Sequence, residues 1–397
     1  MSLTLARRMQ GLRPSAVREI LKVAERPDVI SLAGGLPAPE LFPVKAIADA
    51  CAAVLAEAPG AALQYGITEG YTPLREWIAA ELGAKGVPAT VDRLRITNGS
   101  QQGIDLVARL LLNPGDTVLV ENPTYLAALQ VFAAAEANVI GVPGDEEGVR
   151  MDLLEEAIVS RKPALIYLVT EFQNPRGTSL SPARRQALAD LAHKHEVPIL
   201  EDDPYGALRF AGKPDKPMAA YAPDITFHLG TFSKTLAPGL RIGWLFGPSE
   251  AMRPLTIAKQ ACDLHTATLA QRVASKLLET FDYHGHLETI RRVYGERCQA
   301  MLEGLERHMP EGTRWSRPEG GLFLWLELPN GLRDEDVFHA AIERQVAVVP
   351  GSGFFADGAD HGFLRLNYSN QSIGNIRIGV ERLGETIRTL SAAKAQA

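Results

Sequence analysis

Apolar residues in the middle of this chain gather in short runs, and the stretches between several runs carry helical periodicity. The runs have the character of buried strands and cover residues 94–97, 117–121, 138–142, 164–170, 198–202, 225–230 and 243–246. Helical spacing is clearest at residues 102–112 and 182–195. This alternation, over about 150 residues, predicts an α/β fold with a mostly parallel, seven-stranded sheet flanked by helices. Binding sites in such folds lie at the carboxyl ends of the strands.

The pattern changes in the last third of the chain. Residues 264–306 have the periodicity of long helices, most clearly at 288–305. Beyond Pro318 we expect strands at 322–327, 347–349 and 363–368, and helices at 333–343 and 373–391. This mixture predicts a second, smaller α+β domain.

Amino-acid composition limits the cellular locations and the binding partners that the protein can have. The 397 residues are 46% hydrophobic and 22% charged, with a formal charge of −6 and both signs mixed along the chain. This balance predicts a globular protein without a nucleic-acid partner. No apolar run approaches the ~18 residues of a membrane span, and residues 1–8 lack the apolar core of a signal peptide. Three scattered cysteines and unsuitably spaced histidines predict no disulfide framework and no metal site, so we expect a cytoplasmic protein.

Polar residues follow the first two of these strands. Strand 94–97 enters a turn with Gly99, Ser100 and Gln101 that opens a helix, and free N–H groups at a helix start suit a phosphate. The alternative is that Ser100 is an ordinary helix cap. Tyr125 follows the next strand and either stacks on a planar ring or packs in the core.

Two further strand ends carry an amide and acids. Asn174 stands in a Pro–Gly turn that faces the predicted crevice. Asp202 ends an apolar strand, where a carboxylate is costly unless a cation meets it, such as a protonated ring nitrogen. Glu201 and Asp203 beside it are expected to face solvent or cap a helix. Tyr205 adds a phenol to the same edge.

The loop after the strand at 225–230 carries Thr231, Ser233, Lys234 and Arg241. A lysine in such a site forms an imine with an aldehyde cofactor, while hydroxyls and a guanidinium hold a phosphate dianion. The alternative is a solvated loop lysine. Arg365 lies on a later strand, and its fork of donors matches an α-carboxylate, unless it belongs to a surface ion pair.

Five motifs, in this order along the chain, give the site a family resemblance. They are Gly99-Ser100-Gln101-Gln102, Asn174-Pro175-Arg176-Gly177, Asp202-Asp203-Pro204-Tyr205, Ser233-Lys234 through Arg241, and Phe363-Leu364-Arg365-Leu366. The chain resembles pyridoxal-phosphate enzymes of fold type I over residues 14–383. Within these it is most similar to the aminotransferases that include 2-aminoadipate aminotransferases of the LysN type and kynurenine/aminoadipate aminotransferases.

The resemblance implies a role for each of these residues. Lys234 forms the imine with pyridoxal 5'-phosphate and moves the proton, Asp202 pairs with the pyridine nitrogen, and Tyr205 completes the catalytic set. The implied cofactor-binding residues are Ser100, Gln101, Tyr125, Asn174, Asp202, Tyr205, Thr231, Ser233, Lys234, Arg241 and Tyr65. Among these, Tyr125 stacks on the ring, and Tyr205 and Asn174 bond its 3-oxygen. Tyr65 resembles a tyrosine that reaches the phosphate from a partner subunit, which implies a homodimer with shared active sites.

The resemblance also implies how substrate is bound. Arg365 holds the α-carboxylate, and Asn174, the Gly34-Gly35 turn and Tyr65 also belong to the substrate-binding residues. Ser15 and Arg18 match a serine and an arginine of a mobile helix that recognises the substrate side chain. The implied division is an N-terminal arm with this helix at 1–45, a large cofactor-binding domain at 46–285 and a small domain at 286–397 that packs with part of the arm.

We therefore expect a ping-pong aminotransferase that moves the amino group of 2-aminoadipate, glutamate, leucine or an aromatic amino acid to a 2-oxo acid, with 2-oxoglutarate as the acceptor. An aromatic or kynurenine-type transaminase and a cysteine-conjugate β-lyase are alternatives on the same site. A regulator with an aminotransferase-like domain is disfavoured, because the chain starts with the arm and shows no helix-turn-helix segment or basic patch. Lys234 together with Asp202 argues against an inactive binding protein.

Overall fold

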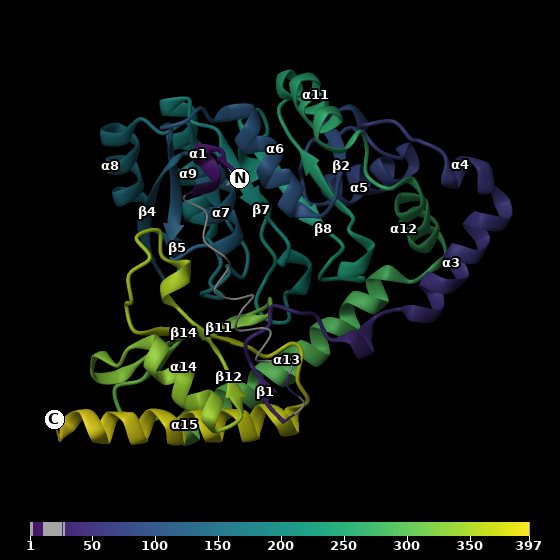
Figure 1. Cartoon of the computed structure of the whole chain (residues 1–397). Helices are drawn as coiled ribbons and strands as arrows, with labels where there is room; N and C mark the ends of the chain where they lie inside the picture. The colour runs from purple at the N-terminus through teal and green to yellow at the C-terminus, as the bar shows by residue number, and fades with distance from the viewer. Residues whose placement is uncertain (1–2, 11–25, 27, 397) are drawn as a thin grey trace.

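The computed structural model describes residues 3–10, 26 and 28–396. Its centre is an eight-stranded sheet in the order β2-β9-β8-β7-β6-β3-β4-β5 (Figure 1). The seven expected strands are all present as β2 (Leu94–Thr97), β3 (Thr117–Asn122), β4 (Asn138–Asp145), β6 (Leu165–Leu168), β7 (Ile199–Asp202), β8 (Thr226–Thr231) and β9 (Gly243–Phe246). The two-residue β5 (Gly148–Val149) extends one edge. Only β9 and β5 run against the direction of the other strands.

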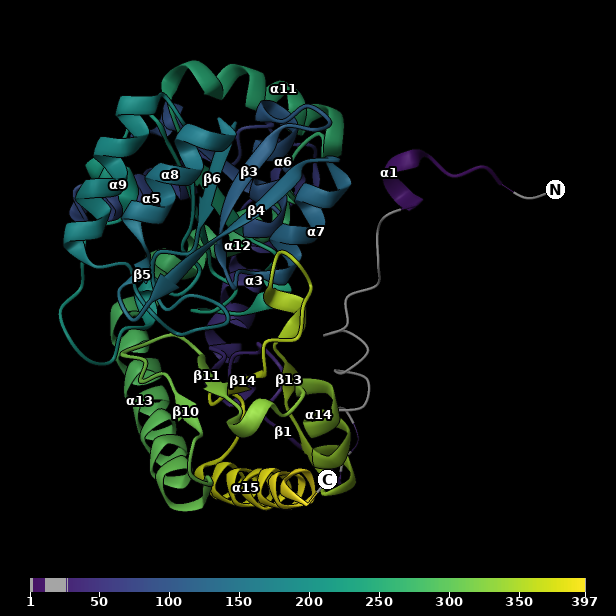
Figure 2. The same ribbon diagram turned by 90° about the vertical axis from the view of Figure 1, so that its left-hand side faces the viewer.

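Helices cover both faces of this sheet (Figure 2). Val118 and Val120 of β3 point to one side and pack with α6 (Ser100–Leu111) and α7 (Leu126–Ala134). Leu119, between them, packs on the other side with α8 (Met151–Arg161) and α9 (Pro182–His195). Because both faces are covered, apolar residues stand at consecutive positions of the strands rather than at alternate ones, which explains the continuous apolar runs of the sequence.

Other helices complete the large part of the molecule. Around the β2 edge a separate core forms with α3 and α12, which pack against each other, and with α5. The bounds are α1 (Arg7–Gln10), α3 (Val44–Glu57), α4 (Pro59–Leu63), α5 (Thr72–Ala84), α10 (Met218–Tyr221), α11 (Met252–Asp263) and α12 (Thr268–Thr280). No helix in the described part of the chain combines the length and apolar character of a membrane span.

The C-terminal third forms the smaller α+β part. Its antiparallel sheet has the order β10-β11-β14-β13, and the 26-residue α13 packs along α15 beside it. The bounds are α13 (Tyr283–His308), β10 (Arg314–Trp315), β11 (Phe323–Glu327), α14 (Asp334–Glu343), β13 (Val349–Pro350), β14 (Phe363–Asn367) and α15 (Ile373–Ala395). The expected elements are therefore present, and the boundary expected at residue 285 falls within the first turn of α13.

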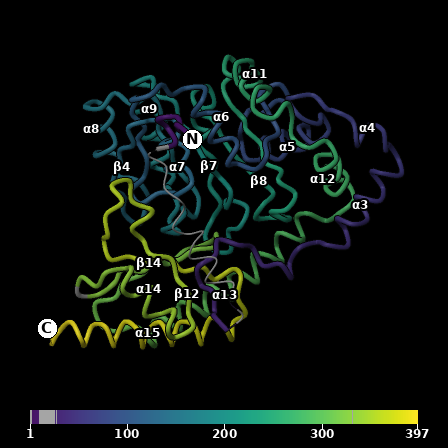
Figure 3. The backbone as a smooth tube through the Cα atoms, in the orientation of Figure 1, coloured from purple at the N-terminus to yellow at the C-terminus, as the bar shows by residue number. Residues whose placement is uncertain are grey.

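The prediction of a single strand at 347–349 is wrong in one respect. The segment forms two short strands, and they belong to different sheets. β12 (Val346–Ala347) pairs in parallel with β1 (Ile30–Ser31), and β13 pairs with β14. The backbone trace shows the result: the N-terminal segment passes through the small part before it reaches α3 (Figure 3). Residues 30–36 are thereby brought to the junction between the two parts.

Candidate active site

The carboxyl ends of β6, β7 and β8 face the small part across a cavity of about 290 Å³. Twelve of the residues predicted from the sequence line this cavity. They come from the N-terminal segment, the large part and the small part of the chain. They are Gly35, Ser100, Gln101, Tyr125, Asn174, Asp202, Tyr205, Thr231, Ser233, Lys234, Arg241 and Arg365. Residues far apart in the sequence thus lie together in one site, at the carboxyl ends of the strands where such folds bind ligands.

The other four predicted residues do not line the cavity. Gly34 is buried next to Gly35. Tyr65 is 78% exposed and lies edge-on against His265, with ring centroids 5.7 Å apart. Ser15 and Arg18 lie outside the described residues. The roles expected for Tyr65, Ser15 and Arg18 stay predictions.

Lys234 follows β8 and enters the cavity from the loop of residues 231–241. Its Nζ donates a hydrogen bond of 2.8 Å to the carbonyl of Gly35. Burial, together with the positive charges of Arg365 and Arg241, lowers the pKa of Lys234 to about 8. The amine is therefore far closer to its neutral, nucleophilic form at physiological pH than a solvated lysine, which excludes the interpretation as an ordinary loop residue.

Asp202 at the end of β7 is a buried carboxylate with one satisfied oxygen. Tyr167 donates to Oδ2 over 3.0 Å, whereas Oδ1 is buried and has no hydrogen-bond partner in the described chain. Burial raises the pKa of Asp202 to about 7, although the bond from Tyr167 works in the opposite direction. A cationic N–H group placed against Oδ1 would restore the charged form.

Arg365 on β14 is 4% exposed and forms no ion pair with any described carboxylate. Nη1 donates to Oδ1 of Asn174 over 2.9 Å and Nη2 to the carbonyl of Ala33 over 2.8 Å, while Nε is buried without a partner. Its guanidinium lies over the ring of Phe323, 4.3 Å from the centroid. The alternative of a surface ion pair is therefore wrong, and the group is suited to an anionic ligand.

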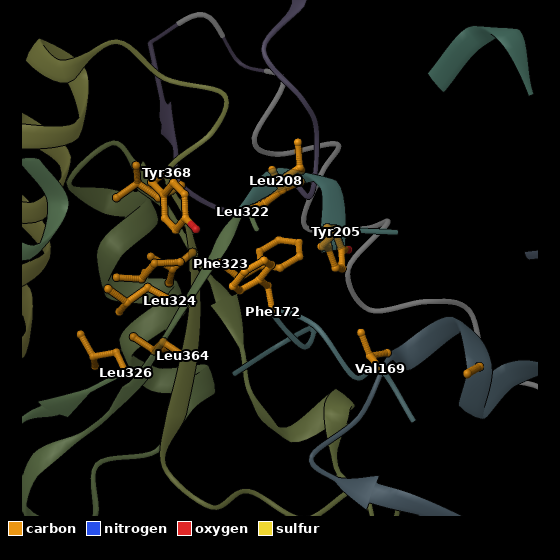
Figure 4. Packing of buried hydrophobic residues seen from close by; sticks show 14 of the residues in the cluster. Val169, Phe172, Tyr205, Leu208, Leu322, Phe323, Leu324, Leu326, Leu364 and Tyr368 are labelled. Carbon is orange, nitrogen blue, oxygen red and sulfur yellow. The ribbon is translucent and has the colours of Figure 1, made fainter. Parts of the chain in front are cut away.

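The aromatic wall of the site comes from the junction between the two parts (Figure 4). Tyr205 of the large part meets Phe323 of β11 edge-on, with ring centroids 5.8 Å apart. Burial raises the pKa of the Tyr205 hydroxyl, whereas the Asn174 side chain, which lines the same cavity, lowers it less strongly. Asn174 thus lies between Tyr205 and Arg365 and connects the two sides of the cavity.

The turn that opens α6 has the geometry of an anion site. Gly99 has a φ of 71° and is the residue before the helix, and no side chain caps the helix start, so Ser100 is not an ordinary N-cap. A Cβ at Gly99 would lie 2.6 Å from Nη2 of Arg241, which donates 2.9 Å to the carbonyl of Asn98. The first N–H groups of α6 and the Arg241 guanidinium therefore share one corner of the cavity.

Three other residues near this corner form hydrogen bonds to neighbouring groups with their side chains. The hydroxyls of Thr231 and Ser233 lie 2.9 Å apart, and Thr231 Oγ1 also accepts from the Ser233 backbone N–H. The side-chain amide of Gln101 donates to the carbonyl of Ala127 over 3.2 Å. Gln101 therefore offers the cavity its backbone N–H, and its side chain fixes α6 against α7.

Glu201, the neighbour of Asp202, does not face solvent. It is fully buried and caps α10, accepting from the backbone N–H groups of Met218 and Ala219, and it also bonds Nδ1 of His228 at 2.8 Å. The guanidinium of the buried Arg185 lies 3.8 Å away. Burial alone would raise the pKa of Glu201, but the contacts with His228, Arg185 and the Met218 N–H lower it to about 2. These contacts fix the strand that carries Asp202.

Residues 27–383 match the family model of aminotransferase class I and II. The chain belongs to this family. It is 43% identical over 388 residues to aromatic-amino-acid aminotransferase 1 of Thermococcus litoralis, and the match covers 95% of this chain and 92% of that protein. It is 41% identical over 385 residues to 2-aminoadipate transaminase of Thermus thermophilus, with 96% of both chains covered.

A solved structure extends the comparison to the fold. LysN, the α-aminoadipate aminotransferase of Thermus thermophilus complexed with N-(5'-phosphopyridoxyl)-L-leucine, has a TM-score of 0.92, with 39% identity and 98% of both chains covered. The protein is thus a pyridoxal-phosphate-dependent aminotransferase of fold type I, in the subgroup of 2-aminoadipate and kynurenine/aminoadipate aminotransferases.

The site fits this cofactor on observations of its own. The unpartnered Oδ1 of Asp202 matches a protonated ring nitrogen, and Lys234 is an amine of lowered pKa. The Gly99 turn with Arg241 matches a phosphate dianion. Each of the three functional groups of the cofactor therefore has a chemically suitable counterpart in the aminotransferase.

Sequence reasoning missed several residues of the site. Tyr167, which bonds Asp202, lies inside an apolar strand, where a tyrosine resembles any other core residue. Phe323 and Leu36 line the cavity but carry no polar group that would mark them. The one available signal was the position of Tyr167 on the strand beside β7, because neighbouring strands place such residues side by side.

We expect the aminotransferase, once freed of its cofactor, to show a Lys234 amine that titrates with a midpoint near pH 8. Only the neutral amine reacts with acetic anhydride, so labelling of Lys234 should rise from about pH 6 and level off above about pH 9. Peptide mass spectrometry after a short pulse measures this. The exposed Lys45 in the same digest is the reference, and a common midpoint for the two lysines would contradict the expectation.

Proposed function

We propose that this aminotransferase moves the amino group of an L-amino acid to 2-oxoglutarate in a ping-pong reaction, with 2-aminoadipate, glutamate, leucine and aromatic amino acids as donors. The observation that carries the proposal is the buried Arg365, which has no carboxylate partner among the described residues and shares one cavity with Lys234 and Asp202. The donor range is supported by relatives whose names refer to aromatic amino acids and 2-aminoadipate, and by the leucine adduct held by LysN.

The proposed chemistry needs an electron sink and a base. Pyridoxal phosphate supplies an aldehyde that takes up the amino group and a ring that accepts the electrons left when the Cα proton is removed. Asp202 keeps the ring nitrogen protonated, because a charged partner is the condition under which this buried carboxylate is stable. Lys234, with a pKa of about 8, would take the proton from the substrate Cα and deliver it to the aldehyde carbon of the cofactor.

The remaining residues orient the reactants. The helix start at Ser100, with Ser233 and Arg241, binds the phosphate, and Thr231 supports Ser233. Tyr205 and Asn174, which line the same cavity, would bond the ring oxygen, and Tyr125 would pack against the ring. These contacts fix the cofactor at both ends, so that the Lys234 amine meets the reacting bond in one geometry.

On the substrate side, Arg365 binds the α-carboxylate through its fork of donors, and Asn174 fixes the plane of that fork. The guanidinium is held over Phe323, and this contact limits its freedom to turn. A rigid, pre-oriented fork loses little conformational entropy when it binds the carboxylate.

We also propose a homodimer in which Tyr65 reaches the site of the partner. Support comes from a row of apolar side chains exposed in the single chain: Leu63 (70%), Tyr65 (78%), Ile67 (55%) and Leu264 (53%). Tyr65 is held against His265, which also bonds the backbone N–H of Gly66. An apolar group presented in this way is typical of a subunit interface.

Incubation with L-2-aminoadipate and 2-oxoglutarate is expected to yield glutamate, with parallel lines in double-reciprocal plots. Lys234→Ala should lower turnover by at least about a thousandfold, because the base is lost. Glutamate is measured by a coupled assay, and pyruvate and ammonia are measured with a cysteine conjugate in the same preparation. Pyruvate and ammonia as the main products would identify a β-lyase and overturn the proposal.

Arg365→Lys is expected to raise KM about 10- to 100-fold for every amino donor, since a point charge replaces a two-pronged contact. Steady-state kinetics with 2-aminoadipate and leucine measure the change. Arg314→Lys, an exposed arginine on β10 of the same sheet, is the matched control and should leave KM unchanged. An unchanged KM in Arg365→Lys would remove the assignment of the α-carboxylate to this residue.

Arg18→Ala tests whether Arg18 binds a distal carboxylate, an assignment that rests on the sequence. We expect kcat/KM for 2-aminoadipate to fall at least about tenfold while the value for leucine stays within about twofold, because only the first substrate carries a second carboxylate. Arg26→Ala, at an exposed arginine paired with Asp28, is the control. An equal loss for both donors would show that Arg18 does not distinguish them.

A further inference from the structure

Behind the turn that opens α6 lies a lysine with no place in the proposed chemistry. Lys259 of α11 has a fully buried side chain. Its Nζ lies 3.0 Å from Oε1 of Gln102, 3.0 and 2.9 Å from the two carboxylate oxygens of Asp263, and 3.1 Å from Oγ1 of Thr266. An ammonium has three N–H groups, and here all of them have acceptors.

Asp263 extends the contacts of this lysine to both sides of the turn. Its Oδ2 accepts 2.7 Å hydrogen bonds from Nδ2 of Asn98 and from Nε2 of Gln102. Oε1 of Gln102 in turn accepts from the backbone N–H of Asn98 over 2.9 Å. We name Asn98, Gln102, Lys259, Asp263 and Thr266 the Lys259 cluster.

The Lys259 cluster clamps the residues on either side of Gly99, Ser100 and Gln101. Thr266 donates to the carbonyl of Ile96 at the end of β2, over 3.2 Å. Asn98 stands just before the turn and Gln102 just after it. The positive φ of Gly99 and the direction of the first N–H groups of α6 therefore depend on Asn98 and Gln102, which are both held by the ion pair of the buried Lys259 and the partly buried Asp263.

The buried ammonium of Lys259 lowers the stability of the protein unless every one of its N–H groups has an acceptor. A buried ammonium strongly destabilises a protein when its partners are lost, and a neutral side chain of the same length would avoid that cost. A packed methionine would suffice to fill the space between α11 and α6. The charged group provides fixed directions for the Asn98 and Gln102 side chains, which an apolar contact does not.

We propose that Lys259 is a positioning residue that holds the Gly99–Gln101 turn in the conformation that binds the cofactor phosphate. The inference rests on the proposed assignment of this turn to the phosphate. Lys259 acts through Gln102 and Asp263 and does not itself touch the cofactor. Its effect is therefore specific to the phosphate and does not extend to the aldehyde or the ring.

The test compares pyridoxal 5'-phosphate with pyridoxal, which lacks only the phosphate. The full chain is freed of cofactor and titrated with each compound, and the two dissociation constants are measured from cofactor absorbance and tryptophan fluorescence. Lys259→Met should raise the constant for pyridoxal 5'-phosphate at least about tenfold and change that for pyridoxal less than about twofold. An equal rise for both compounds, or no rise for either, would overturn the proposal.

A second variant keeps the ion pair of Lys259 and Asp263 and removes the contacts that Gln102 makes on the far side of the turn. Gln102→Met removes the hydrogen bonds of the Gln102 side chain to the Asn98 backbone, Lys259 and Asp263. It should raise the constant for pyridoxal 5'-phosphate at least about fivefold, with pyridoxal unaffected. Because this variant retains Lys259 and Asp263, it tests the proposal even where Lys259→Met does not fold. An unchanged preference for the phosphorylated compound in Gln102→Met would contradict the proposal.

Two further measurements separate the possible failures. Lys45→Met removes an exposed lysine that pairs with Asp49 at the same i, i+4 spacing on α3, and it should leave both constants unchanged. Wild-type protein that binds pyridoxal as tightly as pyridoxal 5'-phosphate would refute the phosphate assignment itself. Wild-type protein with a strong preference that persists in both variants would refute only the role of Lys259.

Discussion

The buried carboxylate of Asp202 is the constraint on which the rest of the site depends. A carboxylate with one unpartnered oxygen is unfavourable at the end of an apolar strand, and its raised pKa of about 7 expresses that cost. The surrounding structure offsets it only in part, through the hydroxyl of Tyr167. The unpartnered Oδ1 leaves room for a cationic N–H group, and the protonated ring nitrogen of pyridoxal phosphate is a chemically suitable one.

The fold supplies the rigidity that such a site needs. The sheet is covered on both faces, and Glu201, one residue before Asp202, is fixed by His228 and by the start of α10. The small part contributes Arg365, which is joined to the large part through Asn174 and to the N-terminal segment through Ala33. Because Gly35 of that same segment accepts from Lys234, three regions of the chain meet within the site and restrain one another.

The polar residues that follow the strands could be predicted because they are marked by the local sequence. An apolar run followed by a polar turn marks Asn174, Asp202 and Lys234 without knowledge of the fold, and all three line the cavity. The burial of Glu201 could not be predicted, since its partner His228 is 27 residues away and either interpretation of the acid fits the sequence. The split of 347–349 into two strands likewise depends on β1, far away in the chain. Lys259 gave no signal, because its partner Gln102 lies 157 positions distant.

Burial brings the pKa values of the acidic and basic groups of the site closer together. It raises the pKa of Asp202 to about 7 and lowers those of Lys234 to about 8 and Arg365 to about 10, in each case because the charged form is disfavoured. Arg365 still stays charged at neutral pH and can bind a carboxylate. Lys234, by contrast, comes close to the pH at which a general base is most effective. One physical cause, exclusion of water by the two parts of the molecule, thus leaves the anion-binding group charged and makes the amine a base.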